Sequence, residues 1–333
     1  MPRATARAMA AIEPQTARKQ HLHLDHRMTE QTPQRCGLVA VIGAPNAGKS
    51  TLVNQLVGQK VAITSAKAQT TRARLLGIAL TQAQDGAATQ IILIDTPGIF
   101  APRRRLDRAM VHAAWEGTVS ADAVVLMVDP LKQRRHELEP LLESLAERPE
   151  KKLLVLNKVD VSKKEPLLEL AQELAGKVGF SEVFFISALT GDGVPGLKAQ
   201  LAAMMPEGPW HYPEEQVSDA SERLLAAEVT REQLYRQLHE ELPYDSAVRP
   251  ESYQTRKDGS VEIHQQIVIA RDSQKPIVLG KRGARIKAIG EAARAELATI
   301  LGVPVHLFLH VKVDEKWSDS REIFEEIGLD WVR

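Results

Sequence analysis

Four short segments carry residue types that together could bind a nucleotide. They are 43–50 (GAPNAGKS), 95–98 (DTPG), 157–160 (NKVD) and 187–188 (SA). The first combines glycines, whose N–H groups can turn onto phosphates, with a lysine and a hydroxyl side chain. The second offers a carboxylate to a metal ion, and the third offers an amide and a carboxylate to a base. Their order predicts one nucleotide site built from four loops.

The pattern Gly43-x-x-x-x-Gly48-Lys49-Ser50 falls between an expected strand and an expected helix. We expect Lys49 to reach the β- and γ-phosphates and the Ser50 hydroxyl to ligate Mg²⁺. A plain glycine-rich turn is the alternative, which the strand–loop–helix context disfavours. The nucleotide contacts expected here are Gly43, Ala44, Pro45, Asn46, Ala47, Gly48, Lys49, Ser50 and Thr51.

Asp95 ends an apolar run, where a carboxylate can hold Mg²⁺ directly or through a water. The Gly98 N–H is a candidate for capture by a γ-phosphate and release after hydrolysis. We favour Thr71 over Thr70 to complete the metal shell when GTP is bound; a capping or turn role is the alternative for either. The expected metal ligands are Ser50, Thr71 and Asp95, and further nucleotide contacts are Thr96, Pro97, Gly98 and Ile99.

The segment 157–160 follows an apolar run and selects guanine in this interpretation. Asp160 can accept hydrogen bonds from guanine N1–H and from its exocyclic amine, and adenine lacks that pair of donors. This argues against an ATPase or a small-molecule kinase. We expect Asn157 to join this loop to the phosphate loop and the Ala188 N–H to meet the base carbonyl. The remaining expected contacts are Lys158, Val159 and Ser187.

Length and composition suit about two globular domains, because the chain has 333 residues and is 44% hydrophobic. Lysine plus arginine and aspartate plus glutamate are both 43, so a nucleic-acid surface must come from local clustering. A single cysteine, Cys36, fits a reducing compartment. Residues 1–35 are polar without a hydrophobic signal core, so we expect a disordered extension of a cytoplasmic protein, with Met1 and Met28 both candidate starts.

Residues 36–204 alternate buried-type strands with helical patterns, which predicts an α/β domain with a mostly parallel sheet. The expected strands are 38–42, 74–80, 90–94, 123–128, 153–156 and 183–186. Three prolines make 205–218 an expected linker. In the α+β region 219–333 we expect a helix over about 220–240, strands at 248–256, 261–269 and 304–311, a helix from 284 to about 301, and a polar tail.

Gly280-Lys281-Arg282-Gly283 precedes the long helix of this second domain. Glycines permit close approach of a sugar–phosphate backbone, and a helix N-terminus favours phosphate. From Arg271 to Arg294, seven basic residues face two acidic ones, a local charge of 7 − 2 = +5. The expected RNA contacts are Lys275, Gly280, Lys281, Arg282, Gly283, Arg285 and Lys287, and apolar side chains at 277–279, 286 and 289 would line a groove or belong to the core.

With these residues the chain resembles the bacterial Era GTPases, from about Leu38 to the end. The resemblance rests on the nucleotide loops, on 69–72 (QTTR), on 221–228 and 241–244, and above all on their combination with 280–283. It implies a P-loop GTPase domain followed by a type II KH domain. It also implies binding to the 3′ end of small-subunit ribosomal RNA during assembly of the small ribosomal subunit, as a monomer with peripheral contact to the inner membrane.

The residue after Gly98 is Ile99, which cannot orient a water molecule as the glutamine of other switch GTPases does. In related families an asparagine at the position of Asn46 helps to hold K⁺, whose charge can assist hydrolysis. A turn residue is the equal alternative for Asn46. The expected catalytic residues are therefore Lys49, Thr71 and Asn46. A competing function is a signalling GTPase whose C-terminal domain docks a protein or membrane; Arg103, Arg104 and Arg105 are expected in a solvated loop.

Overall fold

The computed structural model describes residues 33–65, 67, 70–100, 102, 104–132, 135–238 and 242–332. Residues 1–32 of the expected extension, and Gln69, Arg103 and Glu241, lie outside this set. The first strand begins at Gln34, so the last residues assigned to the extension belong to the sheet. None of the helices within the described ranges has the length and apolar character needed to cross a bilayer.

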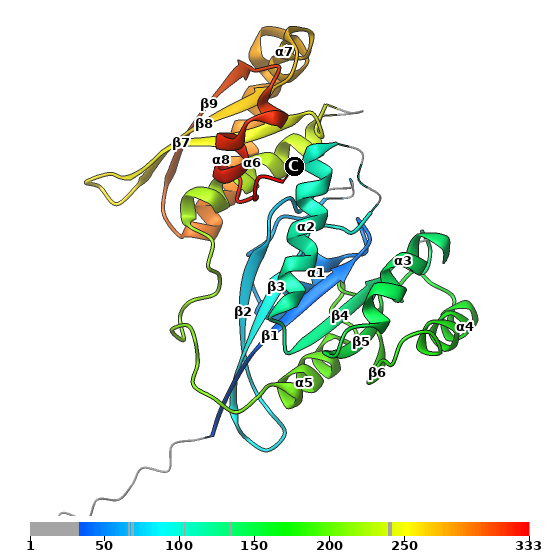
Figure 1. Cartoon of the computed structure of the whole chain (residues 1–333). Coiled ribbons are helices and arrows are strands. Elements are labelled where there is room, and N and C mark those ends of the chain that lie inside the picture. The colour runs from blue at the N-terminus through cyan, green and yellow to red at the C-terminus, as the bar shows by residue number, and fades with distance from the viewer. Residues whose placement is uncertain are drawn as a thin grey trace, which may run out of the picture. The chain divides into compact units, whose positions relative to one another are not determined.

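The first domain is built on a six-stranded sheet with the order β2-β3-β1-β4-β5-β6 (Figure 1). Only β2 is antiparallel to its neighbour, which confirms the mostly parallel sheet. Each expected strand is present; the strand at 123–128 has the expected ends, and the ends of the others are shifted by up to four residues. The strands are β1 (Gln34–Gly43), β2 (Leu75–Gln82), β3 (Ala88–Asp95), β4 (Ala123–Val128), β5 (Lys151–Leu156) and β6 (Glu182–Phe185).

Helices cover both faces of this sheet, because successive residues of a strand point to opposite sides. Val41 packs in one core with Leu52 and Leu197, and Ile42 packs in another with Leu141 and Leu167. This double burial explains the continuous apolar runs of the sequence. The helices are α1 (Lys49–Val57), α2 (Arg105–Val119), α3 (Arg135–Ala146), α4 (Lys164–Ala175) and α5 (Val194–Met204).

The expected linker 205–218 is bound along the sheet. The Cys36 N–H donates to Pro206 O at 3.1 Å, and the Ile78 N–H donates to Val217 O at 2.8 Å. Trp210 packs on the apolar cluster that contains Cys36. An extended segment that is held by backbone hydrogen bonds does not require a periodic pattern of apolar residues. The prolines were therefore the clearest structural signal in this part of the sequence.

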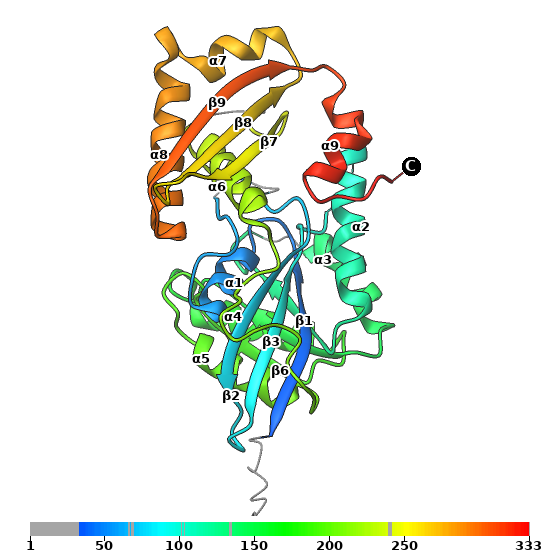
Figure 2. The ribbon, with the colours of Figure 1, turned by 90° about the vertical axis from the view of Figure 1, so that its left-hand side faces the viewer.

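The second domain is a three-stranded sheet, β7-β8-β9, with β7 antiparallel and β9 parallel to β8. The helices α6 and α8 pack on one face of this sheet (Figure 2). Leu234 of α6 and Ile289 of α8 share a core there with Ile267 of β8. This arrangement confirms the α+β KH domain. Its elements are α6 (Glu222–Gln237), β7 (Ser246–Thr255), β8 (Val261–Ile269), α7 (Lys275–Leu279), α8 (Ala284–Leu301) and β9 (Val305–Val313).

The sequence predicts a polar tail after 311, but the C-terminal segment also contains a buried turn and a helix. A 3₁₀ turn at Trp317–Asp319 and the helix α9 (Arg321–Glu326) bury Trp317 and Phe324 in a cluster with Leu106 and Met110 of α2. Few but large apolar residues suffice for this packing because aromatic side chains bury large areas.

The expectation of a solvated arginine loop at 103–105 is only partly right for the two arginines that the structure describes, because Arg104 is exposed whereas Arg105 is the first residue of α2 and is half-buried. Arg104 pairs with Asp245 at 2.8 Å, and Arg105 pairs with Asp319 at 3.3 Å. The Arg105 guanidinium also lies 4.5 Å from the ring centroid of Trp331. Their partners are far away in the sequence, so a local reading of the charge run could not identify them.

Candidate functional site: a nucleotide pocket and a GxxG loop

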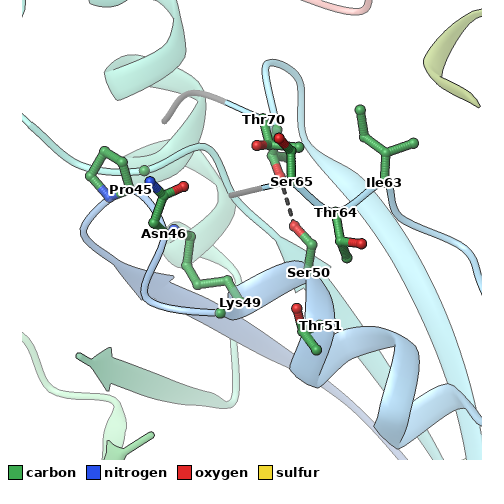
Figure 3. A pocket seen from close by; sticks show the side chains of 12 residues that line it. Pro45, Asn46, Lys49, Ser50, Thr51, Ile63, Thr64, Ser65 and Thr70 are labelled. Atoms are coloured by element: carbon green, nitrogen blue, oxygen red, sulfur yellow. Dashed lines mark hydrogen bonds between the residues drawn. The ribbon is translucent and has the colours of Figure 1, made fainter. Parts of the chain in front are cut away.

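The phosphate loop connects β1 to α1, at the carboxyl edge of the parallel strands where ligands bind in such sheets. Asn46, Lys49 and Ser50 line a pocket that faces Thr64 and Thr70 of the following segment (Figure 3). Gly48 has a left-handed φ of 102°, and a Cβ there would lie 2.3 Å from Asn157 Nδ2. Glycine is therefore required at 48 both by its backbone angle and by the base loop packed against it.

Lys49 holds the loop closed on itself. Its Nζ donates to Gly43 O at 3.2 Å and to Ala44 O at 3.0 Å. Burial lowers the pKa of Lys49 to about 8, and the charge of Asp95 opposes this shift. A phosphate brought into this pocket would supply the negative charge that favours the protonated amine.

The three expected metal ligands converge. Ser50 Oγ lies 2.8 Å from Thr71 Oγ1 and 2.7 Å from Asp95 Oδ2, and Thr71 Oγ1 lies 3.2 Å from the same carboxylate oxygen. Thr70 instead donates its hydroxyl to Lys67 O at 2.9 Å. The geometry thus distinguishes the two threonines and brings Thr71, the residue we favoured, to the other two.

This group of oxygens fits Mg²⁺. Asp95 is fully buried, and its Oδ1 has no hydrogen-bond partner among the described residues. Burial raises the pKa of Asp95 to about 6, while Ser50, Lys49 and Thr71 act in the opposite direction. Two hydroxyl oxygens beside an incompletely paired carboxylate are the hard donors that Mg²⁺ prefers.

The second loop touches the first. The Ile99 N–H donates to Gly43 O at 3.0 Å, and a Cβ on Gly98 would lie 2.7 Å from Pro45 N. Thr96 is buried and donates its hydroxyl to Val41 O at 2.8 Å, so it supports the loop from within the sheet. Gly98, the candidate γ-phosphate sensor, lines the same pocket as Asn46.

Asn157 joins the base loop to its neighbours. Its Nδ2 donates to Ala47 O at 2.7 Å, and its Oδ1 accepts from the Ala188 N–H at 2.9 Å. The first contact agrees with our expectation. The second corrects it, because the Ala188 N–H that we assigned to the base carbonyl is donated to Asn157.

Asp160 is exposed and lines a cleft of about 440 Å³ together with Asn157, Lys158, Ser187 and Ala188. The expected selection of guanine by Asp160 therefore depends on a carboxylate that the protein leaves exposed and that the bound base would desolvate. Val159 packs on the core of the α3–α4 face. Thr51, expected at the phosphates, lines both this cleft and the phosphate pocket.

Asp129 is a residue of the base site that the sequence reasoning missed. It follows β4, is 3% exposed, and accepts from Lys158 Nζ at 2.5 Å. Lys158 also donates to Asn46 O at 3.2 Å. The signal was present, because Asp129 comes directly after the buried strand β4, much as Asp95 is the last residue of the buried strand β3.

The GxxG loop lies between α7 and α8, as the sequence predicted. Gly280 combines a φ of 71° with a ψ of 176°, a region that only glycine visits readily, and a Cβ there would lie 2.9 Å from Arg285 N. Arg282 and Gly283 also have positive φ values, of 51° and 77°. The loop thus presents backbone at the N-terminus of an 18-residue helix.

Basic side chains surround this loop with few partners. Within the described ranges, Lys275, Lys281 and Arg282 are exposed, and their side chains make no hydrogen bond or ion pair. Arg285 instead donates to Ile277 O at 3.2 Å, and Lys287 lies 3.8 Å from Glu291. Of the expected apolar lining, Val278 and Ile289 are core residues, Ile277 is 48% exposed, and Leu279 lines a hollow beside the loop.

Comparisons with known proteins match both halves of the chain. The family described as 50S ribosome-binding GTPase matches residues 38–158, and the family described as KH domain matches residues 241–318. GTPase Era of Erythrobacter litoralis is 79% identical over 306 residues, which cover 92% of this chain and all of that protein. GTPase Era of Rhizobium meliloti is 56% identical over 90% of this chain and 95% of that protein.

Two solved structures match most of the chain. A single-substitution variant of Aquifex aeolicus Era bound to GDP·AlF4⁻ aligns with a TM-score of 0.83 at 36% identity, covering 89% of this chain and 99% of that one. Era in complex with MgGDPNP and nucleotides 1506–1542 of 16S ribosomal RNA aligns with a TM-score of 0.82 at the same identity and coverage.

Phosphate, metal and base loops on one edge of a parallel sheet define a P-loop GTPase, which here is fused to a KH domain. The sequence identity and the coverage of the Era relatives define the family of GTPases more narrowly. The chain belongs to the Era family of GTPases.

Proposed function

We propose that this protein is a GTP-hydrolysing switch that binds the 3′ end of small-subunit ribosomal RNA and acts in assembly of the small subunit. The observation that carries the RNA assignment is the exposed GxxG loop with its unpaired cations at the start of α8. The complex of Era with 16S ribosomal RNA, at 36% identity over 89% of this chain, supports the choice of RNA.

The nucleotide chemistry follows from the loops. Lys49 and the N–H groups at the start of α1 bind the phosphates, and Ser50, Thr71 and Asp95 hold Mg²⁺. Mg²⁺ neutralises charge on the β- and γ-phosphate oxygens when it is bound. Asp95 must be deprotonated for this role, and because burial raises its pKa to about 6, protons compete with Mg²⁺ increasingly as the pH falls towards that value. Asn157 and Asp160 position and select the guanine.

Asn46 has two possible roles, as a K⁺ ligand and as a turn residue, and substitutions of Asn46 distinguish them. Its φ of 64° suits a turn residue, and its position in the phosphate pocket suits a K⁺ ligand. We expect hydrolysis to accelerate when K⁺ replaces Na⁺, and the difference to vanish in Asn46→Ala and Asn46→Asp, in steady-state phosphate release. Asn46→Gly keeps the positive φ but lacks the amide, so a K⁺ effect that survives in this variant would support the turn role alone.

RNA binding is testable with an oligonucleotide of the small-subunit 3′ end and a scrambled control of equal length. We expect tighter binding to the authentic sequence, and an affinity whose log–log salt dependence has a slope of about −0.7 per neutralised phosphate. Fluorescence anisotropy at several salt concentrations measures both. Equal affinities for the two sequences, or no dependence on salt, would remove the RNA assignment.

Ribosomal RNA as a partner places this activity in the cytoplasm. A monomeric state and a peripheral contact with the cytoplasmic face of the inner membrane complete the proposal, and both rest on the family resemblance. A C-terminal domain that docks a signalling protein or membrane is the weaker candidate, since an exposed cationic loop with glycine-only backbone suits a sugar–phosphate chain better.

A further inference from the structure

Helix α6 has a buried charged face that binds neither nucleotide nor RNA in the scheme above. Glu228 and Tyr235 each lie three or four residues from the adjacent pair Arg231 and Glu232, so the four residues share one side of the helix. Arg231 is 2% exposed, and Glu232 and Tyr235 are fully buried. Because a buried charge costs several kcal/mol unless it is paired, its partners indicate what this face does.

Glu232 holds the beginning of the segment between α1 and β2. Its Oε1 accepts from the Thr64 N–H at 3.1 Å and lies 3.3 Å from Thr64 Oγ1. Its Oε2 accepts from Lys60 Nζ. These contacts join a helix of the KH domain to the side of the phosphate pocket that Thr64 lines.

Arg231 holds the far end of the same segment. Its Nη2 donates to Thr70 O and to Glu228 Oε2. Burial lowers the pKa of Arg231, but Glu228 more than offsets this, and the pKa is above its ordinary value. The guanidinium therefore stays charged and remains a strong donor to the Thr70 carbonyl.

Arg72 fixes the chain on the other side of Thr71. It is 3% exposed, and it donates through Nη1 to Ser246 O at 2.7 Å and through Nη2 to Tyr235 Oη at 3.2 Å. Both neighbours of Thr71 are thus anchored to the KH domain, while Thr71 Oγ1 itself touches Ser50 and Asp95.

We propose that α6 is a positioning element for GTP hydrolysis, in which Glu232 holds Thr64 and Arg231 holds Thr70 so that Thr71 is kept at the metal site. Arg231 acts through the Thr70 backbone and is a positioning residue. The ordering of backbone residues around Thr71 has an entropic cost, and these contacts order them before the nucleotide binds. The inference concerns the GTPase reaction and does not depend on the RNA assignment.

The full-length variant Arg231→Ala tests this inference. We expect kcat at saturating GTP to fall about tenfold to a hundredfold, because small misplacements of a positioning group have effects of this size. The Mg²⁺ concentration for half-maximal hydrolysis should rise, and GDP affinity should stay unchanged, because Thr71 serves the triphosphate state. Arg231→Lys keeps the charge and one donor to the carbonyl, so it should regain part of the rate.

Arg223→Ala is the matched control, because this α6 arginine donates to Pro250 O at 2.6 Å and to no described residue of 60–72. It should hydrolyse GTP at the wild-type rate. A kcat of Arg231→Ala within twofold of wild type, or a loss of GDP affinity as large as the loss of kcat, would overturn the proposal. If Arg231→Ala fails to fold, Glu232→Gln decides: a folded Glu232→Gln protein with wild-type kcat and Mg²⁺ dependence would equally overturn it.

Discussion

Asp160→Asn should convert the guanine site into one that prefers xanthine. Guanine presents N1–H and an exocyclic amine to the carboxylate, whereas xanthine presents a carbonyl in place of the amine, which an amide N–H can meet. A site that leaves a buried polar group unpaired loses about 3 kcal/mol, which corresponds to roughly a hundredfold in affinity. Competition of GTP, XTP and ATP against a labelled nucleotide, followed by calorimetry, measures the change.

Asp192→Asn is a suitable control for this substitution. Asp192 is also exposed, but its side chain lines a neighbouring hollow next to Phe185 and does not line the base cleft. The same change of charge there should leave the order of nucleotides as in wild type. If ATP competes as well as GTP for the wild-type protein, the assignment of Asp160 to base selection is wrong.

The nucleotide loops could be predicted from the sequence because each is a contiguous run at the end of a strand. Gly43–Ser50 needs only its own backbone and the start of α1 to form a phosphate cradle. Parallel strands then bring Asp95 and Asn157 to the same edge without further information. The GxxG loop was predictable for the same reason, since its glycines, cations and helix are adjacent.

The charged face of α6 could not be predicted in this way. Glu232 and its partner Lys60 are separated by 172 residues, and Arg231 and Thr70 by 161. A helix with Glu and Arg at these spacings ordinarily exposes them to solvent, so the periodic pattern gave no reason to expect burial. The packing of α9 against α2 could not be predicted for a related reason. A few large apolar side chains in a polar segment do not form the periodic pattern that indicates a buried helix.

The contacts of α6 also offer a physical route by which the bound nucleotide could affect RNA binding. Helix α6 packs against α8, which begins at the GxxG loop. The same helix also contacts the residues around Thr71, through the hydrogen bond from Arg231 to Thr70 O. If the triphosphate and diphosphate states place Thr71 differently and thereby bind RNA with different affinities, RNA must alter the preference for the two nucleotides by the same factor. The inserted Arg72 side chain is the contact through which such a difference would pass most directly.

Gly283→Asp should abolish binding of the ribosomal RNA oligonucleotide and leave GDP binding intact. Gly283 has open space where a Cβ would stand and a left-handed φ that aspartate tolerates better than most residues, so the fold should survive. The new carboxylate would instead face the phosphates at the start of α8. Like charges brought together at an interface cost several kcal/mol, so we expect a loss of about a hundredfold or more in anisotropy titrations.

Gly283→Asn separates charge from shape, because its side chain has the size of aspartate and the same tolerance of a positive φ. We expect it to retain most of the RNA affinity. Gly280→Ala should behave differently from both, since its Cβ would lie 2.7 Å from Arg285 Cβ and the loop would have to move. RNA binding by Gly283→Asp at wild-type strength would show that the backbone at the start of α8 does not contact the phosphate chain.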